Sequence, residues 1–234
     1  MEHIADTVLK IKHHLMMSSA ETPSKYLMSY ASDNLLLKRY VPELPNGLWM
    51  KAIAEKIGPK YVQVSGEKLK PEVREKLKYW LANRAPQGPL PCGLFLYGLP
   101  GTGKTSILAL LMKILVKRHS FLVNAIEYYT IHEIVDILRL LKSFIPTLRE
   151  RAEYELQCML SLRIIFVDDL ELDWDSEDLR LIAEFIDKLY RKERTLFIVT
   201  NAGDKAIVAA IKNNIHWARI FRRLMEMCYR VAVE

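Results

Sequence analysis

The sequence predicts an α/β fold of three layers, in which helices cover both faces of a parallel sheet. From residue 92 onward, short apolar runs alternate with longer segments of helical periodicity. These runs are hydrophobic almost throughout, as expected of strands that are buried on both faces. A glycine-rich loop also joins the first run to the helix that follows it. The chain has 234 residues, of which 50% are hydrophobic and 26% charged, so it can bury a core and is not a disordered protein.

A small helical region precedes this domain. Residues 3–17 have apolar side chains at helical spacing, namely Ile4, Val8, Ile11 and Leu15. A turn-rich segment, PELPNG (42–47), separates them from a second predicted helix over 48–57. We therefore expect a helical N-terminal region over 1–55, which contacts a partner or DNA, and a main domain over 56–234.

Helices with recognisable starts separate the strands expected in the main domain. A helix over 71–84 has proline at its first position, where the missing N–H costs nothing. Thr130 with Glu133 and Thr147 with Glu150 form capping-box patterns, each of which predicts a helix start. The candidate strands are 93–97, 121–126, 163–167, 195–200 and 228–233.

The glycine-rich loop matches the phosphate-loop pattern G-x-x-x-x-G-K-[ST] in full. Glycines allow the backbone to turn its N–H groups around an anion at the start of the following helix. Lys104 is expected to reach the β- and γ-phosphates of ATP, and the Thr105 hydroxyl is expected to ligate Mg²⁺. The predicted nucleotide-binding residues are Gly98, Pro100, Gly101, Thr102, Gly103, Lys104, Thr105 and Ser106.

Polar side chains follow two of the later strands. Asp168 and Asp169 end the run RIIFVDD, and Asn201 follows TLFIVT. Because such strand ends face the ligand crevice of an α/β sheet, we expect Asp168 to hold Mg²⁺ and Asp169 to act as the base for an attacking water. Asn201 would contact the γ-phosphate or that water. The alternative is that the two acids open a polar loop, since further acids follow closely.

Positive charge is concentrated in two places. Residues 1–91 carry 14 Lys and Arg against 9 Asp and Glu, within a net charge of +6 for the chain. This excess is either an electrostatic footprint for nucleic acid or a solvated helix face. Arg219, Arg222 and Arg223 form a second cluster. One of these guanidinium groups would stabilise the transition state at a γ-phosphate, unless the cluster simply lies at the surface.

Other features restrict the class of protein. Cys92, Cys158 and Cys228 show no C-x-x-C spacing, so we expect reduced core residues rather than a metal or disulfide site. No apolar run approaches the ~20 residues that span a bilayer, and the first twenty residues do not have the pattern of a signal peptide. We therefore expect a cytoplasmic protein without a membrane segment.

Five segments carry a resemblance to a known family. They are GLPGTGKT, YYTIHEIVDILRLLKS, IIFVDDLELD, LFIVTN and RIFRRLMEMC. Together they resemble AAA+ ATPases of the DnaC/DnaI and IstB type, which are replicative helicase loaders and transposition helpers. The resemblance implies a P-loop NTPase sheet of the AAA+ (ASCE) type, with the sensor strand between the phosphate-loop and Asp168 strands and without a C-terminal lid domain. It also implies that Arg223 is an arginine finger acting on a neighbouring subunit of a homo-oligomer, with Arg219 and Arg222 as fallback choices.

The resemblance implies an ATPase that uses ATP and Mg²⁺ and acts on DNA. The leading hypothesis is a DnaC-like replicative helicase loader; an IstB-like transposition helper differs only in its client, a transposase. Such a protein would bind single-stranded DNA through basic and aromatic residues. Most AAA+ proteins have Asp-Glu where this chain has Asp168-Asp169, so we expect slow basal hydrolysis that a partner or assembly stimulates. Two further alternatives are a small-molecule kinase and an adaptor in which ATP only fixes the conformation.

Overall fold

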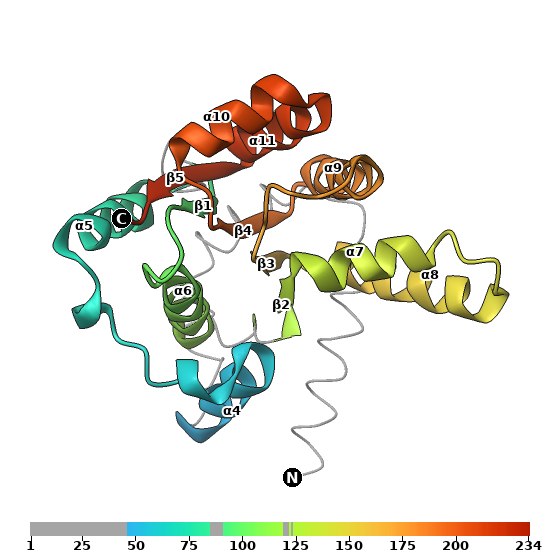
Figure 1. Ribbon diagram of the computed structural model, residues 1–234. Helices are drawn as coiled ribbons and strands as arrows, with labels where there is room; N and C mark the ends of the chain where they lie inside the picture. The colour runs from blue at the N-terminus through green and yellow to red at the C-terminus, as the bar shows by residue number, and fades with distance from the viewer. Residues whose placement is uncertain (1–45, 85–90, 119–121, 123) are drawn as a thin grey trace, which may run out of the picture. The chain divides into compact units, whose positions relative to one another are not determined.

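The computed structural model describes residues 46–84, 91–118, 122 and 124–234, and Figure 1 shows its ribbon. The helix expected over 3–17 lies outside these residues. The first described helix, α4 (Asn46–Ile57), includes the predicted 48–57 and continues past residue 55. The division of the chain at residue 55 stays a prediction. No helix within the described residues is both long and apolar enough to cross a membrane.

The main domain is built on a five-stranded sheet in which all neighbouring strands are parallel. Its strands are β1 (Gly93–Tyr97), β2 (Ile126–Thr130), β3 (Ile164–Asp168), β4 (Thr195–Thr200) and β5 (Cys228–Ala232). The order across the sheet is β2-β3-β4-β1-β5 (Figure 1). β4 therefore lies between β1 and β3, as the resemblance implied.

Helices cover both faces of this sheet, as Figure 1 shows. They are α5 (Pro71–Asn83), α6 (Lys104–Arg118), α7 (Ile131–Leu140), α8 (Pro146–Ser161), α9 (Ser176–Arg191), α10 (Asp204–Asn213) and α11 (Ile215–Met227). Successive strand residues point to opposite faces, so Leu94 and Leu96 share a core with α4, α5 and α6. Phe95 and Tyr97 share the core of the other face with α7, α8, α9 and α11. The predicted three-layer α/β fold is confirmed.

The register of the sheet brings the ends of its strands level. Tyr97 at the end of β1 lies beside Thr200 at the end of β4. Further along the sheet, Thr130 of β2 lies beside Asp168 at the end of β3. The loops that follow β1, β3 and β4 consequently meet at one edge, which is where open α/β sheets bind their ligands.

The chain around β2 differs in part from the prediction. The strand expected over 121–126 begins only at residue 126, because β2 is a half-buried edge strand that needs no continuous hydrophobic run. Thr130 caps α7 and forms the expected capping box with Glu133. The second predicted box does not form, because α8 begins at Pro146 and Thr147 already lies inside the helix.

The three cysteines differ in burial. Cys228 is buried and Cys92 is half-buried, but Cys158 is exposed. The expectation of a core cysteine is therefore wrong for Cys158, because α8 turns Leu156 and Met159 toward the core instead.

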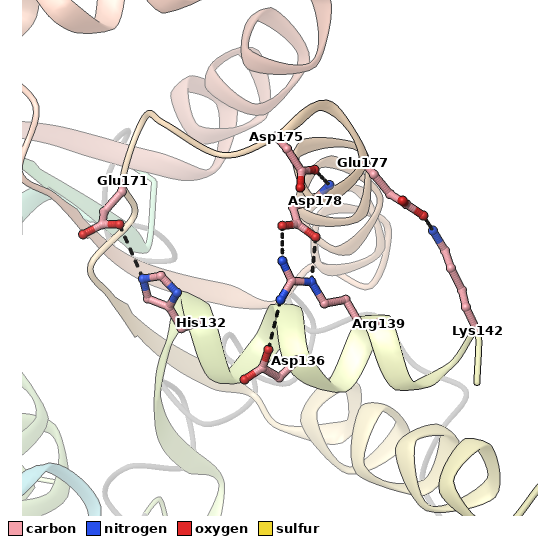
Figure 2. Close-up of polar contacts among 8 residues, drawn as sticks. All are labelled: His132, Asp136, Arg139, Lys142, Glu171, Asp175, Glu177 and Asp178. Atoms are coloured by element: carbon pink, nitrogen blue, oxygen red, sulfur yellow. Dashed lines mark hydrogen bonds and ion pairs between the residues drawn. The ribbon is translucent and has the colours of Figure 1, made fainter. Parts of the chain in front are cut away.

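Polar contacts join α7 to α9 and to the loop that follows β3 (Figure 2). Arg139 of α7 donates two hydrogen bonds to the carboxylate of Asp178 on α9, one of them from Nε at 2.9 Å. The backbone N–H of Asp178 donates to Asp175, the N-cap of α9, at 2.8 Å. Nearer to β3, the His132 ring lies 3.5 Å from the carboxylate of Glu171. These contacts hold the loop after β3 against α7.

Candidate nucleotide-binding site

The loop between β1 and α6 contains glycines in left-handed conformations. Gly98, Gly101 and Gly103 have φ values of +145°, +77° and +89°, which other residues rarely adopt. A Cβ atom at Gly98 would also lie 2.1 Å from the carbonyl oxygen of Val233. The loop therefore needs glycine at these positions. It leads directly into the N-terminus of α6, where a helix favours a bound anion.

The ammonium group of Lys104 is held within this loop. The residue is only 3% exposed, and Nζ donates to the carbonyl oxygens of Gly98 at 3.0 Å and Leu99 at 2.5 Å. Burial lowers the pKa of Lys104, and the charges of Asp168 and Asp169 oppose that shift. A phosphate in the loop would replace neutral carbonyl partners with a charged one, which makes a stronger hydrogen bond.

The remaining loop residues lie close to this group. Thr102 accepts a hydrogen bond from Lys104 at 3.3 Å and donates one to the Leu99 carbonyl at 3.0 Å. Pro100 is exposed, and Ser106 lines the two cavities described below. The structure thus places all of the predicted nucleotide-binding residues in and directly after one loop.

Asp168 lies at the end of β3 and is 1% exposed. Its Oδ2 accepts a hydrogen bond from the Tyr128 hydroxyl at 3.0 Å, and its Oδ1 accepts one from the Asp169 N–H at 2.9 Å. The Thr105 side chain adjoins this carboxylate and lowers its pKa. Burial raises the pKa of Asp168 above its ordinary range, against the opposing effect of Thr105, the Asp169 N–H and the Tyr128 hydroxyl. The two residues predicted to hold Mg²⁺, Thr105 and Asp168, are therefore neighbours.

Asp169 and Asn201 meet at the same edge of the sheet. The Asn201 Nδ2 donates to Oδ1 of Asp169 at 3.3 Å. Asp169 has a φ of +60°, a left-handed conformation that is uncommon outside glycine and clusters at functional sites. The N–H of Leu170 donates to the Val199 carbonyl at 2.9 Å and fixes the turn that follows. The predicted base and the predicted sensor amide are thus neighbours.

Two cavities adjoin the phosphate loop. The larger, of about 590 Å³, combines apolar walls from Leu69, Val73 and Val233 with the side chains of Lys60 and Lys70. The smaller, of about 200 Å³, is lined by residues that include Tyr61, Lys104, Thr105 and Asn201. Gly101, Gly103 and Ser106 line both. An apolar hollow that continues into a basic loop suits a molecule with a flat base and a phosphate chain.

Sequence reasoning missed the walls of the larger cavity. They come from residues 60–73 and from Val233, which lie far apart in the sequence and carry no motif. Lys60 and Lys70 belong to the basic excess of the first 91 residues. Part of the positive charge of the first 91 residues therefore faces the phosphate loop. The charge count alone does not show this position.

The residues present fit Mg²⁺ bound together with a nucleotide. Mg²⁺ takes oxygen ligands and is usually held by one or two protein groups, substrate phosphates and water. Thr105 and Asp168 supply one hydroxyl and one carboxylate. Across the described residues, no group of three or more His, Cys, Asp or Glu side chains forms a site that would hold a metal without the nucleotide.

The three arginines lie on α11, on the sheet face opposite α6 (Figure 1). Arg219 and Arg223 both donate to the buried carboxylate of Asp187 on α9, from their Nε atoms at 2.7 and 2.9 Å. Arg223 also donates to Glu226 at 2.8 Å. Arg222 is the exposed member, with 66% of its side chain accessible. The structure does not bring this cluster to the phosphate loop of the same chain.

Comparison with known proteins identifies the fold. No protein-family model and no curated protein matches the sequence. Among solved structures, the DnaC helicase loader superposes with a TM-score of 0.56 at 19% identity, over 75% of this chain and 99% of that one. DnaI gives 0.53 at 17% identity, over 75% and 93%. The initiator DnaA bound to AMPPCP and single-stranded DNA gives 0.51 at 16%, over 76% and 51%. With its phosphate loop and strand order, the chain shares the P-loop α/β fold of these structures.

Proposed function

We propose that this chain is an ATPase that binds Mg·ATP at the edge where β1, β3 and β4 end. The observation that carries the proposal is the meeting of two pairs of neighbouring residues beside one phosphate loop. The Thr105 side chain adjoins Asp168, and Asn201 donates to Asp169. The first pair offers oxygen ligands to a cation. The second offers a carboxylate and an amide to a water molecule.

Different residues of the chain carry out different parts of ATP hydrolysis. The loop N–H groups and Lys104 hold the phosphates. The phosphate oxygens replace the backbone carbonyl oxygens that Lys104 contacts in this structure. Mg²⁺, held by Thr105 and Asp168, would neutralise charge that develops on the phosphate oxygens. Asp169 takes the proton of the attacking water as general base, and Asn201 orients that water. Asp169 is one methylene shorter than glutamate and already bonded to Asn201, so basal hydrolysis is slow.

An arginine from a neighbouring subunit completes this site. Arg223 is the proposed finger, because a guanidinium beside a γ-phosphate stabilises the transition state. In the described chain Arg223 is bound to Asp187 and Glu226. It must therefore exchange those partners when copies of the chain assemble, which makes hydrolysis dependent on assembly.

The proposed role is that of a cytoplasmic helicase loader that acts with single-stranded DNA. The AAA+ fold shared with the DnaC loader over nearly all of that structure supports this assignment. DnaA, whose structure contains AMPPCP and single-stranded DNA, shares the same fold. A transposition helper would use the same site with a transposase as client.

Calorimetry on the full chain tests the nucleotide proposal. Mg·ATP and Mg·ADP should each bind, and the products should be ADP and inorganic phosphate without a phosphorylated acceptor, which distinguishes an ATPase from a kinase. Lys104→Ala should abolish binding, while Lys117→Ala, on the exposed end of the same helix, should not. Absence of nucleotide binding in the unaltered protein, alone or assembled, would refute the proposal.

A pull-down from the source cell tests the role. The full chain with ATP should retain a replicative helicase, whereas recovery of a transposase would favour the transposition helper. An adaptor that only binds ATP would keep its partner function after Asp169→Asn and lose it after Lys104→Ala. An ATPase cycle would be disrupted by both substitutions.

A further inference from the structure

Tyr128 lies outside the sequence motifs, yet it contacts the carboxylate at the centre of the candidate site. It belongs to the edge strand β2, next to β3. Its hydroxyl donates to Oδ2 of Asp168 at 3.0 Å. The ring packs with the core on the α6 side of the sheet. Tyr128 therefore reaches the end of β3 from the neighbouring strand, without being part of the phosphate loop.

The two oxygens of Asp168 have separate donors. Oδ1 accepts the N–H of Asp169 at 2.9 Å, and Oδ2 accepts the Tyr128 hydroxyl. One donor alone would leave the carboxylate plane free to rotate about its terminal bond. Two donors on different oxygens define that plane, and the Thr105 side chain adjoins the carboxylate so defined.

We propose that Tyr128 is a positioning residue for magnesium, because its hydroxyl holds the Asp168 carboxylate toward Thr105. This inference rests on the proposed function and names a residue that acts through Asp168. Groups that hydrogen-bond to a metal ligand typically change metal affinity by about 10- to 100-fold when they are removed. The affinity of the protein for nucleotide without metal depends on the loop and should not change.

The next residue in the strand offers a matched control. Tyr129 is also a half-buried tyrosine of β2, but its side chain packs with the core of the opposite face. Burial and the charge of Glu127 raise the pKa of Tyr129 to about 12. Tyr128→Phe and Tyr129→Phe each remove one hydroxyl and keep the ring. Only the first removes a donor to Asp168.

Binding of a fluorescent ADP analogue to the full chain, titrated with Mg²⁺, tests the inference. Tyr128→Phe should raise the Mg²⁺ concentration for half-maximal enhancement of binding by about 10-fold or more. Affinity in EDTA should stay within about twofold of the unaltered protein, and excess Mg²⁺ should restore full binding. Tyr129→Phe should titrate like the unaltered protein, while Asp168→Asn should lose the Mg²⁺ effect altogether.

Three results would overturn the inference. The first is a Tyr128→Phe protein that titrates with Mg²⁺ like the unaltered one. The second is an equal shift in Tyr129→Phe. The third is a loss of affinity in EDTA together with a lower thermal midpoint and an unchanged Mg²⁺ midpoint, which indicates a structural role. If the unaltered protein takes up no nucleotide, the proposed function fails first and this inference fails with it.

Discussion

Two buried aspartates, Asp168 and Asp187, have opposite electrostatic surroundings. Asp168 accepts its hydrogen bonds from neutral hydroxyl and amide donors, and burial raises its pKa. Burial also raises the pKa of Asp187, but hydrogen bonds and charge from Arg223 and Arg219 outweigh burial and hold it below its usual range. One carboxylate is thus buried with neutral donors, whereas the other is bonded to two cations.

The difference indicates what each aspartate is for. A buried carboxylate bonded to neutral donors is stabilised when a cation binds beside it, because its charge has lost the stabilisation of water. A carboxylate bonded to two guanidinium groups has little to gain from another cation. We therefore interpret Asp168 as part of a ligand site, and Asp187 as the contact that joins α9 to α11 and holds Arg223 in an unassembled chain.

The largest predicted effect concerns Arg223 as an arginine finger. Arg223→Ala should lower hydrolysis by the assembled protein on the order of 10³- to 10⁵-fold, while ATP binding persists. Mixing it with Asp169→Asn subunits should restore hydrolysis. The Asp169→Asn subunit supplies an intact Arg223 to a neighbouring site in which Asp169 is intact. Arg222→Ala is the exposed control and should leave the rate unchanged. Loss of activity in Arg222→Ala alone would assign the finger to Arg222.

Asp169→Asn should separate chemistry from binding. Removing a general base typically costs about 10² to 10⁴ in rate, and the amide keeps the size of the side chain. Phosphate release should fall by that factor, while the dissociation constant for Mg·ATP stays within about twofold. A substitution that weakened binding as much as hydrolysis would show that Asp169 mainly shapes the loop. The interpretation of this residue as a base would then be wrong.

Neutralising each aspartate in turn tests the comparison directly. Asp187→Asn should lower the free energy of unfolding by about 2 to 3 kcal/mol, less than for a fully buried pair because Arg219 is partly exposed. Asp168→Asn should change it by less than about 0.5 kcal/mol or increase it, since burial disfavours the charged form there. Urea unfolding without nucleotide measures both. Equal losses in the two variants would contradict the comparison.

Much of the fold and the arrangement of the candidate site could be predicted from sequence because both depend on local patterns. The phosphate loop needs glycine for its left-handed backbone, so its chemistry is visible in residue types. Asp168, Asp169 and Asn201 follow strands, and a parallel sheet brings such ends to one edge. The pairing of Asn201 with Asp169 follows from β4 lying beside β3.

The parts that could not be predicted depend on contacts between distant segments. Tyr128 reaches Asp168 only because β2 pairs with β3 in a particular register, and the sequence reasoning had set that strand several residues too early. The larger cavity joins Lys60 and Leu69 to Val233 at the other end of the domain. The ion pair between Arg223 and Asp187 could not be predicted either, since Asp187 is one of many acidic residues in the sequence of a helix.

The smallest predicted effect is on the pH dependence of stability. Because the pKa of Asp187 is lower in the folded chain than its ordinary value of about 3.9, the folded state binds its proton less readily than the unfolded state. The resulting stability is present above about pH 4 and is lost as the pH falls through the lowered pKa. The difference in unfolding free energy between the unaltered protein and Asp187→Asn should therefore shrink between pH 5 and pH 3, by at most about 1.4 kcal/mol per pH unit.

Denaturant unfolding at several pH values measures this, with Asp136→Asn as an exposed control on α7. A difference that stays constant over this range would show that Asp187 acts through packing rather than through its charge.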